Sequence, residues 1–89
     1  MNKFYLVQIT DVNGEYENTT SCLAISTEDE IQEKANDIAR TWYAEDGDDL
    51  DDDQCYHFSN GCAVYADCFR EISEQTFNEL KPILAVLVY

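Results

Sequence analysis

Basic residues are scarce in this chain of 89 residues, which has 5 lysines and arginines against 19 aspartates and glutamates. Phosphate backbones and anionic membranes are both bound by clustered lysine and arginine side chains. The net charge of −14 therefore excludes direct binding to nucleic acid and to anionic membrane surfaces. It does not imply disorder, because 45% of the residues are hydrophobic and 12% are aromatic, enough to form a core.

The chain also lacks long apolar segments. No run approaches the length of about 18 residues that a membrane-spanning helix needs. The first ten residues contain one lysine but neither a continuous apolar run nor a small-residue cleavage site, so we predict no signal peptide and a cytoplasmic location. Four cysteines without an export signal are then expected to be reduced thiols that pack as small hydrophobic side chains.

The N-terminal third predicts a β-hairpin. Residues 4–12 and 15–25 are rich in aromatic and β-branched side chains, and Asn13-Gly14 between them is typical of a two-residue hairpin turn. Alternation along the strands predicts one face that belongs to the core. That face comprises Tyr5, Val7, Ile9, Tyr16, Cys22 and Ala24.

A helix is predicted next, over residues 28–44. Thr27-Glu28-Asp29-Glu30 has the sequence of a capping box, in which the Thr27 hydroxyl accepts a hydrogen bond from the Glu30 amide. Apolar residues then recur at helical spacing. They are Ile31, Ala35, Ile38, Ala39, Trp42 and Tyr43.

The second half predicts a further hairpin and a second helix. Residues 45–53 form an acidic loop, and strands 54–59 and 62–72 follow around a second turn at Asn60-Gly61. Ser73 is the predicted N-cap of a short helix that ends near Pro82. Residues 83–89 are predicted to be a final strand, with a continuation of the helix as the alternative. Residues 1–89 thus make one α+β domain of order β-β-α-β-β-α-β, with an antiparallel sheet of two Asn-Gly hairpins and the helices packed on one face.

The cysteines and the single histidine do not have the spacing of a known site. Strict alternation places Cys55, His57, Cys62 and Cys68 on one face of the second hairpin, but this spacing matches no common zinc pattern. The aspartate run lacks the glycine and glutamate positions of a calcium-binding EF-hand. A cysteine nucleophile would need a base and an oxyanion pocket, for which the chain offers one histidine and no glycine-rich loop. We therefore predict no enzyme activity, no metal site and no cofactor.

The remaining candidate site is the negative charge itself. Asp29, Glu33 and Asp37 form a like-charge stripe at i, i+4 spacing, which costs helix stability, and only Glu30 with Lys34 makes a favourable pair. The run that follows has seven acids in nine positions and extends the charge past the helix. The predicted partner-binding residues are Asp29, Glu33, Asp37, Glu45, Asp46, Asp48, Asp49, Asp51, Asp52 and Asp53.

In overall architecture the chain resembles the small acidic inhibitors of phages and mobile elements, namely the anti-CRISPR and antirestriction proteins that mimic DNA. The resemblance covers the N-terminal hairpin, the acidic helix over residues 27–45, the aspartate run, and the segment Phe69-Arg70-Glu71-Ile72-Ser73 before the last helix. It implies a non-enzymatic protein in the cytoplasm of a bacterial host, bound to the basic nucleic-acid-binding surface of a defence complex such as a CRISPR effector. The alternative is an acidic adaptor or accessory domain that binds another basic protein; a metal-binding protein and an enzyme are weaker alternatives.

Overall fold

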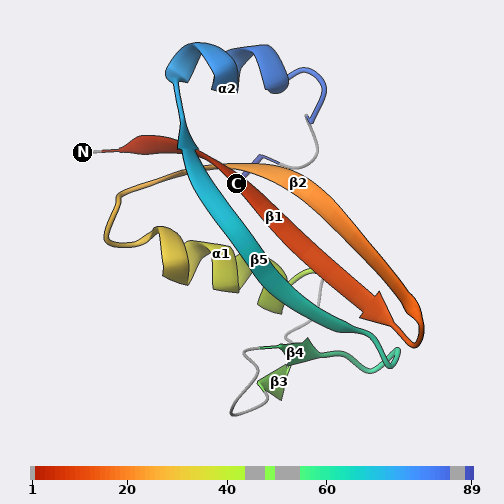
Figure 1. Cartoon of the computed structure of the whole chain (residues 1–89). Coiled ribbons are helices and arrows are strands. Elements are labelled where there is room, and N and C mark those ends of the chain that lie inside the picture. Colours follow the sequence, from red (N-terminus) through yellow and green to blue (C-terminus); the bar gives the residue numbers. More distant parts are fainter. Residues whose placement is uncertain (1, 44–47, 50–54, 85–87) are drawn as a thin grey trace.

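The computed structural model describes residues 2–43, 48–49, 55–84 and 88–89 (Figure 1). Its elements are β1 (Lys3–Asn13), β2 (Tyr16–Ser26), α1 (Ile31–Arg40), β3 (Asp48–Asp49), β4 (Tyr56–His57), β5 (Ala63–Ile72) and α2 (Glu74–Leu80). The strands form one antiparallel sheet of order β2-β1-β5-β4-β3. An α+β fold with an antiparallel sheet is therefore confirmed. No helix in the described part of the chain is long and apolar enough to cross a membrane.

The predicted final strand over residues 83–89 lies partly outside the described residues, because residues 85–87 are not among them. Val88 makes a single parallel bridge with Leu23 of β2, and no strand is assigned between 83 and 89 among the residues described there. A short strand, β3, instead lies within the predicted acidic loop. The order of the elements in the described part of the chain is thus β-β-α-β-β-β-α, and the predicted order is not confirmed at these two places.

The first hairpin has the predicted faces but a different turn. Asn13 pairs with Tyr16, so Gly14 and Glu15 connect the strands, rather than Asn13 and Gly14. Gly14 has a φ of 63° at the first central position, where both types of two-residue hairpin turn require a positive φ. The register is shifted by two residues, and a shift of two leaves every side chain on its predicted face. Five of the six predicted core residues are buried: Tyr5, Val7, Ile9, Cys22 and Ala24. Tyr16 lies at the tip of the hairpin and is 77% exposed.

The second hairpin is shifted by one residue, which exchanges its two faces. His57 pairs with Ala63 and Tyr56 with Val64, because the loop is closed between Phe58 and Cys62 with Gly61 at a φ of 85°. The prediction had His57 opposite Val64. Tyr56 and Phe58 are consequently buried, and His57 is exposed.

A β-bulge in β5 exchanges the faces once more. The pairing with β1 changes register between Gln8, which lies opposite Cys68, and Ile9, which lies opposite Ala66. The extra residue is Asp67, and beyond it the side chains of β5 swap faces. Cys68 is therefore exposed on the face opposite buried Val64. The predicted common face for Cys55, His57, Cys62 and Cys68 is wrong.

The helix α1 is shorter than predicted. It begins at Ile31 and ends at Arg40, and its N-cap, Glu30, makes no side-chain capping bond. The backbone carbonyl of Thr27 instead accepts from the amides of Glu30 and Ile31 at 3.2 and 3.0 Å. The predicted capping box is therefore not formed, because a backbone turn already supplies the partner that the hydroxyl would have provided.

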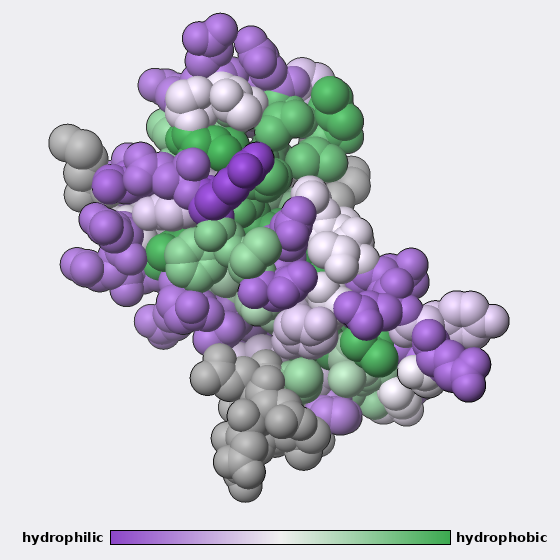
Figure 2. All heavy atoms as spheres, viewed as in Figure 1, coloured by the Kyte–Doolittle hydropathy of each residue, from purple (hydrophilic) through white to green (hydrophobic). Residues whose placement is uncertain are grey.

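The two helices pack on different faces of the sheet, which corrects the prediction of a common face. Ile31, Ala35, Ile38 and Ala39 of α1 join the core cluster that includes Tyr5, Val7 and Ile9 of β1. Phe77 of α2 is buried against the ring of Phe4, at a centroid distance of 4.9 Å. Phe4 and Tyr5 are neighbours in a strand, so their side chains point to opposite faces. In Figure 2, hydrophobic residues gather below α2 on the visible face.

The predicted cap of α2 is confirmed. The Ser73 hydroxyl accepts from the Thr76 amide at 3.1 Å, and the helix ends at Leu80, two residues before Pro82. Both ends of α2 thus follow from residues that are visible in the sequence.

Candidate functional site

The solvent face of α1 carries the part of the predicted acidic surface that lies on a helix. Glu33 and Asp37 are both exposed and lie one turn apart, with the buried side of the helix turned to the sheet. Asp29 is exposed too, but it lies in the turn that precedes α1. The stripe therefore consists of two helical carboxylates and one carboxylate from the preceding turn. We call Asp29, Glu33 and Asp37 the α1 acidic surface.

The other predicted site residues are placed only in part. Asp48 and Asp49 form β3, whose backbone pairs with His57 and Tyr56 of β4. The predicted residues outside the described part of the chain are Glu45, Asp46, Asp51, Asp52 and Asp53. The structure thus connects the acidic segment to the sheet through β3, at the edge opposite β2.

A groove of about 510 Å³ runs beside the α1 acidic surface. Its helical side includes Glu33 and Asp37, and the opposite side includes Ile25 of β2 and the C-terminal Tyr89. The full lining is Ile25, Ser26, Glu30, Glu33, Lys34, Asp37, Ile38, Arg40, Thr41 and Tyr89. The sequence pattern did not reveal that Tyr89 and α1 line the same groove, because this arrangement depends on tertiary packing alone.

Basic residues are interspersed with the acids along this groove. Arg40 Nη2 donates to Asp37 Oδ1 at 3.2 Å, and Lys34 Nζ donates to the backbone carbonyl of Ile25 at 2.7 Å. The predicted pair of Lys34 with Glu30 is not among the ion pairs of the described residues. Among the described residues, Asp37 thus makes an ion pair within 4.0 Å and Glu33 does not.

A part-buried polar cluster lies just after the end of α1, and the sequence analysis did not identify it. The Tyr43 hydroxyl donates to Asp11 Oδ2 of β1 and also lies within hydrogen-bond reach of the Cys62 thiol. Burial, then the hydrogen bond to Asp11, raises the pKa of Tyr43. The phenol consequently stays protonated and remains a donor to the carboxylate. Asp11 Oδ1 is buried without a partner among the described residues, so this carboxylate depends on Tyr43.

Replacing Tyr43 with phenylalanine is expected to destabilise the protein by about 1–3 kcal/mol, because both Asp11 oxygens would then lack a donor. Chemical denaturation monitored by circular dichroism measures the change. Tyr16→Phe removes a hydroxyl from an exposed ring and serves as the control, with no change expected. Equal stabilities of the two variants would contradict a structural role for the Tyr43 hydroxyl.

The four cysteines are reduced thiols and lie in different surroundings. Cys22 and Cys62 are buried, Cys55 is half-buried and Cys68 is exposed. Cys68 lines a hollow of about 230 Å³ with Leu6, Gln8 and Arg70, and its thiol donates to Gln8 Oε1 at 3.3 Å. Within the described ranges, no three histidine, cysteine or acidic side chains are close enough together to hold a metal ion. The predicted absence of a metal site stays a prediction.

Comparisons with protein families, with curated proteins and with solved structures gave no match to this chain.

Proposed function

We propose that this protein binds a basic nucleic-acid-binding surface of a bacterial defence complex and blocks DNA binding by presenting carboxylates in place of phosphates. It acts without enzymatic chemistry and holds its partner in a stoichiometric complex. The observation that carries the proposal is the solvent exposure of Glu33 and Asp37 on a helix of a chain with net charge −14.

The α1 acidic surface suits this role because α1 is anchored firmly to the sheet. Side chains one turn apart on a helix have Cβ atoms about 5–6 Å apart, so Glu33 and Asp37 present two charges at a fixed spacing. Arginine and lysine side chains that hold phosphates also bind carboxylates by charge-assisted hydrogen bonds. A fixed pair of carboxylates can therefore occupy two neighbouring phosphate-binding positions on a partner.

The proposal is tested by competition with DNA. The tagged protein captures its partner from a bacterial host lysate, and mass spectrometry identifies that partner. A fluorescent DNA duplex is then displaced from the purified partner by the acidic protein, and the displacement is followed by anisotropy. We expect stoichiometric displacement that weakens as salt is raised, because charge attraction between exposed groups is screened. A ternary complex that retains the DNA would contradict the proposal.

The second candidate is an acidic adaptor that binds another basic protein away from its nucleic-acid site. The ion pair of Arg40 with Asp37 and the position of Lys34 beside the groove favour it, because these cations interrupt the row of acids. A mixed row of charges fits a specific protein surface better than a uniform phosphate-binding channel. Binding without displacement of DNA is the result expected for the adaptor.

A further inference from the structure

The strand β2 forms one edge of the sheet, and part of this edge is already paired with the C-terminal residue. The Ile25 amide donates to the Tyr89 carbonyl at 3.1 Å, and the Leu23 carbonyl accepts from the Tyr89 amide at 2.7 Å. In an antiparallel pair, the backbone N–H and C=O groups of every second residue point away from the neighbouring strand. The backbone groups of Ser21, Thr19 and Glu17 consequently face the same open side as those of Leu23 and Ile25.

This part of the edge lacks three of the usual protections against strand addition: lysine, proline and a bulge. No backbone hydrogen bond among the described residues reaches the outward groups of Glu17, Thr19 or Ser21. Exposed edges are normally blocked by lysine, proline or a bulge. Residues 16–26 contain neither lysine nor proline, and β2 pairs with β1 without a change of register. Among the described residues, no strand therefore pairs with the edge at Glu17, Thr19 and Ser21.

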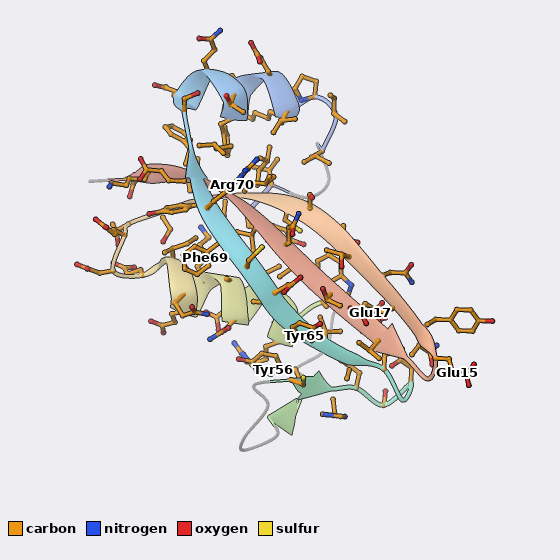
Figure 3. All side chains as sticks on the ribbon, in the orientation of Figure 1. Glu15, Glu17, Tyr56, Tyr65, Phe69 and Arg70 are labelled. Atoms are coloured by element: carbon orange, nitrogen blue, oxygen red, sulfur yellow. The ribbon has the colours of Figure 1, made fainter. Side chains whose placement is uncertain are left out.

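The negative charge at this edge of the sheet indicates what kind of segment could pair with it. Glu15 and Glu17 lie at the far end of the hairpin from the helices (Figure 3), and both are exposed. Tyr16 between them is 77% exposed, and a tyrosine ring also attracts a lysine or arginine that lies over its face. A second copy would bring a net charge of −14 against the same carboxylates, which disfavours self-pairing.

We propose that β2 binds an extended, lysine- or arginine-containing segment of the partner protein, which adds to the sheet alongside Glu17–Ser21. Backbone hydrogen bonds to the outward groups of β2 supply the attachment, as in other cases of strand addition. The carboxylates of Glu15 and Glu17 and the ring of Tyr16 select for positive side chains. The inference rests on the proposed function, and it adds a second contact that is separate from the α1 acidic surface.

Thr19 offers a matched pair of variants for the test. Thr19→Pro removes the outward amide, and proline is tolerated on an edge strand because that amide has no partner in the sheet. Thr19→Val keeps the amide. Both variants lose the hydroxyl that lies 3.0 Å from the Thr10 hydroxyl, so the valine variant controls for that loss. Ser21→Pro and Ser21→Ala repeat the comparison elsewhere on the edge if Thr19→Pro does not fold.

The probe is a short fluorescent peptide of alternating threonine and lysine, and anisotropy at low salt measures its binding to the full chain. We expect the proline variant to bind about tenfold more weakly or worse, and the valine variant to bind like the wild type. Hydrogen exchange followed by NMR should show slower exchange of the Glu17, Thr19 and Ser21 amides when the peptide is bound.

Three results would overturn this inference. Equal binding by the proline and valine variants, or protection confined to α1, would show that the peptide binds without adding to the sheet. Dimers that form at raised salt and are lost in Thr19→Pro would show that the edge accepts a second copy. None of these three results decides whether the α1 acidic surface competes with DNA, because that competition is measured in a separate assay. Failure of this inference is therefore distinguishable from failure of the proposed function.

Discussion

Replacing Glu33 and Asp37 together with lysine is expected to abolish competition with DNA, weakening binding to the partner by about tenfold or more. A charge pair that is desolvated at the centre of an interface contributes far more than one at its rim, and removing one member leaves the other uncompensated. Both side chains are exposed on α1 and take no part in the core, so the fold is expected to persist. Anisotropy competition measures the loss, and circular dichroism verifies the fold.

The matched control is the pair Glu74→Lys and Glu79→Lys on α2. It makes the same change in net charge at two exposed helical positions on the other face of the sheet. If overall charge alone attracts the partner, the two double variants should lose competition equally. A larger loss from α1 than from α2 is the result expected for a defined surface.

The aspartate run is tested in the same assay by replacing Asp49, Asp51 and Asp52 with lysine. Of the aspartate run and the α1 acidic surface, the one that lies at the centre of the interface should show the larger loss of competition when its charges are reversed. If neither this triple variant nor the α1 double variant weakened competition, the acids would serve only to keep the protein soluble. The proposed mimicry of DNA would then be wrong.

The sequence could predict faces more reliably than registers, and the two hairpins show why. In β1 and β2 the alternation of apolar residues survives a register error of two residues, since side chains repeat with a period of two. In the second hairpin an error of one residue moves His57 from the predicted core face to solvent. The position of Gly61 in the loop decides between these registers, and asparagine-glycine alone does not fix that position.

The bulge at Asp67 and the position of α2 could not be read from local patterns. A bulge adds one residue to one strand only, and nothing in the alternation of residues 62–72 requires it. The ends of α2 were predictable from Ser73 and Pro82, because caps and breakers act locally. The face on which α2 packs depends on the distant contact between Phe77 and Phe4.

In the candidate site, too, the local features could be predicted from the sequence and the features that depend on distant contacts could not. Helical spacing was sufficient to predict that Glu33 and Asp37 share an exposed face, since that spacing is a local property of α1. The groove beside them requires Ile25 at the end of β2 and Tyr89, which is distant in sequence from α1. The part-buried cluster of Asp11, Tyr43 and Cys62 likewise joins three separate segments.

Raising the pH from about 9 to about 11 is expected to destabilise the protein through Cys22. This thiol of β2 is fully buried in the core cluster that includes residues of β1 and α1, and burial raises its pKa from 9.0 to about 11. The unfolded thiol therefore loses its proton first, and the folded protein binds more protons over this range. The stabilising contribution is complete below pH 9 and is lost as the pH rises through the folded pKa. A shift of about two units corresponds to roughly 2–3 kcal/mol.

Tyr43 and Tyr89 act in the same direction, since burial raises the pKa of each phenol. The variant Cys22→Ala separates the contribution of the two tyrosines from that of the thiol. It is less stable than the wild type at neutral pH because its side chain is smaller. Its free energy of unfolding should nevertheless fall less than that of the wild type between pH 9 and 11. Cys68→Ala removes an exposed thiol and is the control, expected to keep the wild-type profile. Urea denaturation at each pH measures the free energy of unfolding. If Cys22→Ala lost as much stability over this range as the wild type, ionisation of the buried thiol would not be the cause of the destabilisation.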